Sequence, residues 1–163
     1  MTKSKRGPLK DTTPEVMLAH VLKAVITESK IDKSRIEDLA CGNVMQPGAG
    51  AMQTRAAQLM AGIPVTSTAV AVNRQCSSGI EACSIIASKI KAGIIDVGIG
   101  AGVESMSMYN MMELVDPSSL SDELFENENA RNCLIPMGNT ADTVAKKYNL
   151  NRAELDQFAV DSH

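Results

Sequence analysis

Cys76 is the residue whose surroundings best fit a nucleophile. It is followed by Ser77, Ser78 and Gly79, and it stands where an apolar, β-branched run gives way to an apolar helical pattern. A thiol at the start of a helix faces the positive end of the helix dipole, where unpaired N–H groups favour a thiolate. The same amides can hold the oxyanion that forms when sulfur attacks a carbonyl. These residues make Cys76 a candidate nucleophile toward a carbonyl, with a backbone amide as oxyanion donor.

Packing is the alternative role for each cysteine, because a free cysteine is usually a small buried hydrophobe. Packing is the better account of Cys41, at the end of a strand, and of Cys83, on the apolar flank of a helix. The polar residues 73–75 make simple burial of Cys76 less natural. On the residues alone both interpretations of Cys76 stay open, with the nucleophile slightly favoured.

The cysteine spacing and the composition exclude several classes of protein. The cysteines at 41, 76, 83 and 133 form no CxxC pair, so neither a zinc site nor a disulfide framework is expected, and reduced thiols in an intracellular compartment are the default. Hydrophobic residues make up 44% and charged residues 21%, which is typical of a packed soluble domain. Aromatic residues are only 2%, which argues against a reader of single-stranded nucleic acid. Neither a membrane span nor a secretory signal is expected, because there is no long apolar run.

The charge is unevenly distributed along the chain. The formal net charge is -3, yet the first ten residues carry Lys3, Lys5, Arg6 and Lys10 and no acid. Such a cluster could hold phosphates, but a solvated terminal arm is the more ordinary account.

Three elements must position Cys76. Residues 68–72 predict a strand buried between two layers of helix. Residues 80–93 predict a helix with one narrow polar stripe, which we expect to be largely buried because nearly everything else in it is apolar. Residues 94–103 predict a second buried strand, rich in glycine, where other backbone comes close.

The elements that precede residue 68 also alternate between helix and strand. Pro14 and Glu15 mark the start of an amphipathic helix whose polar side carries His20, which we expect at the surface. Residues 36–44 predict a strand, and residues 51–61 a helix that stops at Gly62. Strands alternating with helices indicate an α/β fold with a mainly parallel sheet.

The pattern changes near the end of the chain. Residues 116–133 are acidic and predict a solvated excursion from the core, that is, a solvent-exposed segment outside the α/β pattern. Residues 138–148 and 151–163 predict two helices, the second opened by a capping box of Asn151 and Glu154.

Residues 73–82, NRQCSSGIEA, resemble the acyl-enzyme cysteine signature of the thiolases, closest to the peroxisomal 3-ketoacyl-CoA type. One departure is Cys83, where the family usually has an aliphatic residue. Other resembling segments occur in the family's order: KSKRGPLKDTTPEVML, ACGNVMQPGAG, RAAQLMAGIPV, GVESMSM and the run that opens CLIPMG. The resemblance implies a layered α/β/α thiolase fold, N-terminal half only. Residues 1–104 would be a partial core, and residues 105–163 part of an inserted loop region.

The resemblance also implies a reaction. Cys76 would attack the keto carbonyl of a 3-ketoacyl-CoA, acetyl-CoA would leave, and free CoA would collect the acyl group, as in fatty-acid β-oxidation. Met137 would line the pocket for the acyl or pantetheine end of the substrate. Coenzyme A would be a substrate and no cofactor or metal is implied. The complete protein would be a peroxisomal homodimer, without nucleic-acid or membrane partners.

The family's GHP, CxGG and NEAF motifs do not occur in these residues. We therefore expect a thiolase fragment, inactive by itself, with exposed apolar surface around Cys76. The alternatives are a biosynthetic acetoacetyl-CoA or sterol-carrier type of thiolase, and a non-catalytic dimerising or binding module.

Overall fold

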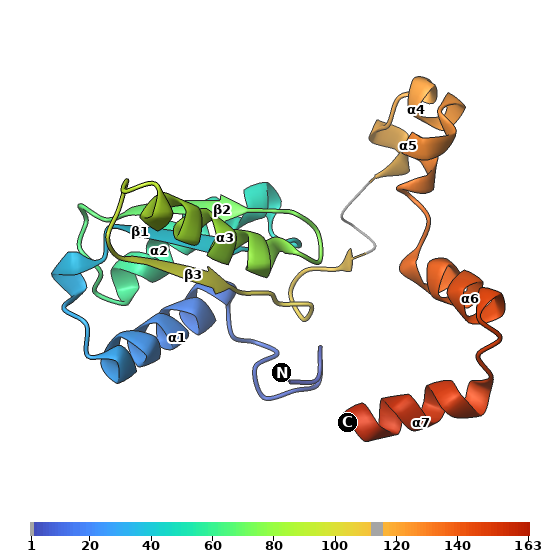
Figure 1. Cartoon of the computed structure of the whole chain (residues 1–163), viewed down its shortest axis with the longest axis horizontal. Helices are drawn as coiled ribbons and strands as arrows, with labels where there is room; N and C mark the ends of the chain where they lie inside the picture. Colours follow the sequence, from blue (N-terminus) through green and yellow to red (C-terminus); the bar gives the residue numbers. More distant parts are fainter. Residues whose placement is uncertain (1, 112–115) are drawn as a thin grey trace. The chain divides into compact units, whose positions relative to one another are not determined.

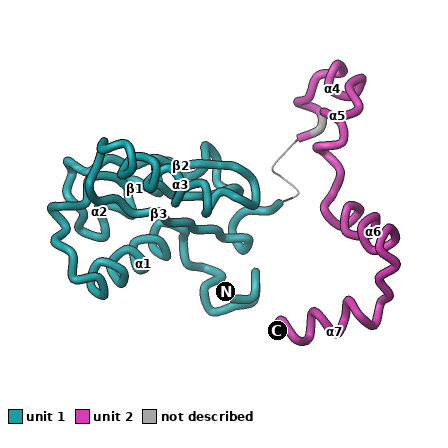
Figure 2. The backbone as a smooth tube through the Cα atoms, viewed as in Figure 1, with its two compact units in different colours: residues 1–114 teal, residues 115–163 magenta. Residues whose placement is uncertain are grey.

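The computed structural model describes residues 2–111 and 116–163. The chain divides into two compact units, residues 1–114 and 115–163, which are coloured separately in Figure 2.

The first unit is a parallel sheet with helices on both faces. In chain order its elements are α1 (Pro14–Ser29), η1 (Lys33–Arg35), β1 (Asp38–Gly42), η2 (Pro47–Gly50), α2 (Ala51–Met60), β2 (Thr68–Val72), α3 (Ser78–Lys91) and β3 (Gly98–Gly102). The strands lie in the order β2-β1-β3 and all pairs are parallel. Helices α1 and α2 cover one face and α3 covers the other (Figure 1). The predicted α/β architecture is confirmed.

The central strand β1 is buried along its whole length and divides the core into two layers. Leu39 and Cys41 point into the larger cluster with α1 and α2. Ala40, between them, packs with Ala82 and Ile86 of α3. This alternation is the two-residue period of a strand that is covered on both faces.

Glycines let α3 lie directly against the sheet. Gly98, Gly100 and Gly102 alternate along β3 with residues of the larger core cluster. A Cβ on Gly100 would lie 2.8 Å from Cα of Cys83, and one on Gly42 would lie 2.5 Å from the carbonyl carbon of Ser78. The close backbone approach predicted for the glycine-rich strand is confirmed, and it extends to the end of β1.

The prediction that α3 is largely buried is wrong. Only Ser78, Ala82 and Ile86 of this helix are buried, because a helix lying on a sheet turns one side toward it. Ile80 is 71% exposed and Ile90 44%. The exposed apolar surface expected around Cys76 is confirmed.

Strands β2 and β3 are also less buried than predicted. Their residues are exposed or half-buried, with Val70 38% exposed. They are the outer strands of the described sheet, and each has β1 on one side only. The central position, and not the apolar composition, decides which strand is buried.

The N-terminal arm lies along the segment that follows β3. Ser4 Oγ donates to the carbonyl of Met106 at 2.9 Å, and the amide of Lys5 donates to Ser107 Oγ at 2.9 Å. Lys10 pairs with the neighbouring Asp11. The arm's basic side chains are exposed, as expected for a solvated arm.

The second unit consists of helices without a buried side chain among its described residues. They are η4 (Pro117–Ser119), α4 (Asp122–Glu126), α5 (Glu128–Asn132), α6 (Met137–Lys147) and α7 (Arg152–Ser162). The two predicted final helices are confirmed, as is the capping box of Asn151 and Glu154. The predicted excursion at 116–133 contains short helices. None of the helices described in either unit is long and apolar enough to cross a membrane.

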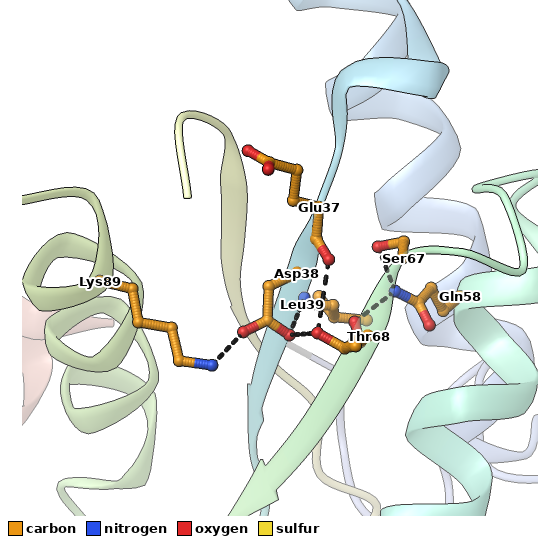
Figure 3. A network of polar contacts seen from close by, with 7 residues as sticks. All are labelled: Glu37, Asp38, Leu39, Gln58, Ser67, Thr68 and Lys89. Carbon is orange, nitrogen blue, oxygen red and sulfur yellow. Dashed lines mark hydrogen bonds and ion pairs between the residues drawn. The ribbon is translucent and has the colours of Figure 1, made fainter. Parts of the chain in front are cut away.

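A polar network fastens α3 and α2 to the amino end of the sheet (Figure 3). Asp38, whose side chain is 2% exposed, pairs with Lys89 of α3. Its carboxylate also accepts from Thr68 Oγ1 at 2.8 Å. Gln58 of α2 donates to the carbonyl of Thr68 at 2.7 Å and to Ser67 Oγ at 2.9 Å.

Gly42→Ala tests the close approach of α3. The new methyl group would overlap the Ser78 backbone, so we expect the free energy of unfolding to fall by about 1–3 kcal/mol. Gly79→Ala is the matched control, because a Cβ there meets no atom within 4 Å and favours the helix by about 0.5–1 kcal/mol. Urea titration followed by circular dichroism measures both, and equal losses in the two variants would contradict the packing.

Lys89→Met tests the ion pair with Asp38. The variant leaves a buried carboxylate without its cation, and we expect a loss of about 1–3 kcal/mol in unfolding free energy, because Lys89 is partly exposed. Lys91→Met, an exposed lysine on the same helix, should change it by less than about 0.5 kcal/mol. The double variant Asp38→Asn/Lys89→Met should recover part of the loss, and failure to do so would show that the charge is not the cause.

Candidate active site

Cys76 lies in the turn that joins β2 to α3, and hydrogen bonds within that turn fix its backbone. Gln75, just before it, has φ of 50°, a left-handed conformation that is strained for a residue other than glycine. The amide of Gln75 donates to Asn73 Oδ1 at 2.9 Å. Ser78 Oγ accepts from the amide of Arg74 at 2.8 Å and donates to the carbonyl of Gln75 at 2.6 Å.

The serine that follows Cys76 also closes this turn. The amide of Ser77 donates to the carbonyl of Arg74 at 3.2 Å, and its hydroxyl donates to the same carbonyl at 2.8 Å. The Arg74 side chain pairs with Glu81 in the first turn of α3. The sequence analysis did not assign these positioning roles. The available signal was the cluster of short polar side chains at a junction, which typically form such turns.

Cys76 is exposed at the carboxyl edge of the sheet. In α/β sheets this edge, outside the ends of the parallel strands, is where ligands bind. The close packing at Gly42 holds the first turn of α3 over the end of β1. The structure thus places Cys76 at an exposed strand-to-helix turn, where the residues predicted it, and its role as nucleophile stays a prediction.

Glu104 joins the ends of β1 and β3 beside this turn. Its carboxylate accepts from the amides of Val44 at 2.9 Å and Met45 at 3.2 Å, and from Asn43 Nδ2 at 3.0 Å. Asn73 Nδ2 in turn donates to the carbonyl of Val44 at 3.3 Å. The sequence analysis missed Glu104 and Asn43, because the contacts between the two strand ends join residues 59 to 61 positions apart.

The other cysteines differ in accessibility. Cys41 has no exposed surface, and burial raises the pKa of its thiol, in agreement with a packing role. Cys83 is exposed, so its predicted burial is wrong for the described residues, although its backbone lies against Gly100. Cys133, in the second unit, is exposed as well.

Met137 is the first residue of α6 in the second unit, and it is 68% exposed. His20 is exposed on α1, as predicted, and His163 follows α7. A cavity of about 460 Å³ in the first unit lies between the start of α1, α2 and Met108, and none of its lining residues belongs to the Cys76 turn. Within residues 2–111 and 116–163, no three His, Cys, Asp or Glu side chains are grouped so that they could hold a metal ion.

Known proteins match the whole chain. The family model for the N-terminal domain of thiolase matches residues 1–163. The peroxisomal 3-ketoacyl-CoA thiolase of Yarrowia lipolytica is 51% identical over 162 residues, which are 99% of this chain and 39% of the relative. The crystal structure of the dimeric peroxisomal thiolase of Saccharomyces cerevisiae has a TM-score of 0.88 at 43% identity, covering 99% of this chain and 42% of that chain.

A second structure of the peroxisomal 3-ketoacyl-CoA thiolase of Saccharomyces cerevisiae is described as five layers built from two core domains of identical topology. It has a TM-score of 0.63 at 45% identity and covers 66% of this chain and 32% of that chain. The chain thus spans about two fifths or less of the length of these relatives. Because the family model matches every residue of the chain, the chain belongs to the thiolase family and corresponds to its N-terminal domain.

Proposed function

We propose that this chain is the nucleophile-bearing part of an acetyl-CoA C-acyltransferase that cleaves 3-ketoacyl-CoA in fatty-acid β-oxidation. The observation that carries the proposal is the position of Cys76. An exposed thiol sits at a rigid strand-to-helix turn, in a chain 51% identical to a protein named 3-ketoacyl-CoA thiolase. Helix starts of this kind favour a thiolate and offer amides to an oxyanion.

The reaction has two stages. In the first, Cys76 Sγ attacks the keto carbonyl carbon, the bond between that carbon and its neighbour on the CoA side breaks, and acetyl-CoA leaves after a proton is added to the new carbanion. In the second, the thiol of free CoA loses its proton and attacks the acyl-cysteine thioester, which releases the shortened acyl-CoA and returns the Cys76 thiolate. A backbone amide at the Cys76 turn would stabilise the oxyanion of each stage.

The proton transfers need further groups. The chain's two histidines are His20, on the surface of α1, and His163, which follows α7. Neither stands in a motif that resembles the family's basic histidine. We propose that the general acid and base come from the remainder of a thiolase-length chain. Met137 would line the acyl or pantetheine pocket, and coenzyme A would serve as substrate, with no cofactor required.

The exposed apolar surface supports an assembly larger than this chain. Val70 on β2 and Ile80 and Ile90 on α3 are large apolar side chains that are exposed, and we propose that they belong to an interaction site. One solved relative is described as dimeric and another as having two core domains. We propose a second core domain and a homodimer for the complete protein, located in the peroxisome as its relatives are named.

The same surface favours a second candidate, a non-catalytic dimerising module. Its apolar face and the outer strand β2 could associate without any chemistry at Cys76. A biosynthetic acetoacetyl-CoA thiolase would use the same nucleophile, and acyl-chain selectivity of the complete enzyme would separate it from the degradative type.

Alkylation of the chain distinguishes an activated nucleophile from a merely exposed thiol. With iodoacetamide at pH 7, we expect Cys76 to react about fivefold or more faster than the exposed Cys133, because the thiolate is the reactive form. Cys41 should react slowest, since it is buried and its pKa is raised. Peptide mass spectrometry over a time course gives the rates, and equal rates for Cys76 and Cys133 would favour the binding module.

Cys76→Ser tests the reaction in a thiolase-length protein that includes this chain. We expect kcat for thiolysis to fall by about a thousandfold or more, with no acyl adduct on the protein in mass spectrometry. Cys83→Ser is the control and should keep near-normal activity. The 163-residue chain alone should show no turnover, and retention of activity by Cys76→Ser would remove the proposal.

A further inference from the structure

Glu104 stands at the point where the carboxyl ends of the strands meet. It follows β3 and accepts hydrogen bonds from the loop after β1, at the amides of Val44 and Met45. Asn43, which is only 2% exposed, donates to Glu104 and to the carbonyl of Val103, and its own Oδ1 accepts from the amide of Gln46 at 2.8 Å. One carboxylate therefore fixes the start of this loop against the end of β3.

The loop is in turn connected to the Cys76 turn through Asn73. Asn73 Nδ2 donates to the carbonyl of Val44 at 3.3 Å, and Asn73 Oδ1 accepts from the amide of Gln75 at 2.9 Å. Gln75 is the residue held at φ of 50°, directly before Cys76. A continuous series of hydrogen bonds thus runs from Glu104 through Val44 and Asn73 to the strained residue beside the thiol.

The chemistry of Glu104 fits this use. All its partners in the loop are donors, and an ionised carboxylate is an acceptor only, so it can satisfy all of them at once. Its hydrogen bonds are also charge-assisted, which makes them about twice as strong as neutral ones. A glutamine at this position would turn an amide N–H group toward a backbone N–H group.

We infer that Glu104 is a positioning residue for Cys76, acting through Val44 and Asn73 on the backbone of the turn. Its importance for catalysis rests on the proposed thiolase function, whereas its effect on the turn does not. Glu104 would act on the turn without contacting a reacting atom itself.

Glu37 provides a matched control at the opposite end of the sheet. This exposed glutamate precedes β1, and its carboxylate accepts from the amides of Asp96 at 2.6 Å and Val97 at 3.2 Å. It joins the same two strands as Glu104 does, but at their amino ends. Replacing either glutamate removes hydrogen bonds to backbone amides near a strand end. Only the hydrogen bonds of Glu104 continue to the Cys76 turn.

The first measurement is amide hydrogen exchange of residues 73–78 in the 163-residue chain. Glu104→Gln should speed exchange in this segment by about tenfold, because a series of bonds that fixes the turn has lost its anchor. Glu37→Gln should leave it unchanged while lowering the urea midpoint by a similar amount. Equal exchange rates of this segment in the two variants would overturn the inference. So would a rate in Glu104→Gln that is no faster than in the unmodified chain.

The second measurement is kinetic, in a thiolase-length protein containing this chain. Glu104→Gln should lower kcat about tenfold with KM nearly unchanged, and Glu37→Gln should change neither. Adding Asn73→Ala to Glu104→Gln should cost little more, since both act on one series of bonds. If the losses in kcat from the two substitutions were additive, the two residues would act independently, and the inference would be overturned. If the Cys76→Ser protein were active, the proposed function would be wrong. The amide exchange of residues 73–78 would still decide whether Glu104 positions the turn.

Discussion

The close approach of α3 to the sheet is the constraint on which the rest of the first unit depends. Gly42 and the alternate glycines of β3 add no side chains of their own between helix and sheet, so the backbone of Ser78 rests on the end of β1. The opposite faces of the same strands carry Leu39, Cys41, Ile99 and Ala101, which pack against α1 and α2. A two-residue alternation thus builds a thick apolar layer on one face and a thin one on the other.

This approach determines the shape of the Cys76 turn. Because β2 ends at Val72 and α3 begins at Ser78, only five residues connect them. Within this connection Gln75 has a left-handed conformation, and neighbouring hydroxyl and amide groups supply hydrogen bonds that hold it there. Polar clusters then fix both ends of the sheet, with Asp38 and Lys89 at the amino end and Glu104 at the carboxyl end. The Cys76 turn is thus held both by its own hydrogen bonds and by the bond from Asn73 to the loop after β1.

Local patterns in the sequence were enough to predict the strands, the helices of the first unit and the last two helices, but not the short α4 and α5. Proline and glycine signals located α1 and α2, the capping box located α7, and the spacing of glycines in β3 predicted close backbone contact, because each of these effects acts within a few residues. Exposure of Cys83 and of most of α3 could not be predicted from composition, since burial depends on what packs against a face. The contacts of Glu104 join residues about 60 positions apart, and no local pattern reports such a pairing.

The first turn of α3 and the turn before it both leave side chains exposed. Ile80 and Cys76 stand four residues apart in the sequence, and both are exposed. Under the proposed function, the remainder of the enzyme would bring a general acid and base to the exposed Cys76 thiol. Burial of the apolar face would then stabilise the fold and exclude water from the reaction in one step. The interface that covers the exposed Ile80 would then also be the one that completes the site of the proposed nucleophile.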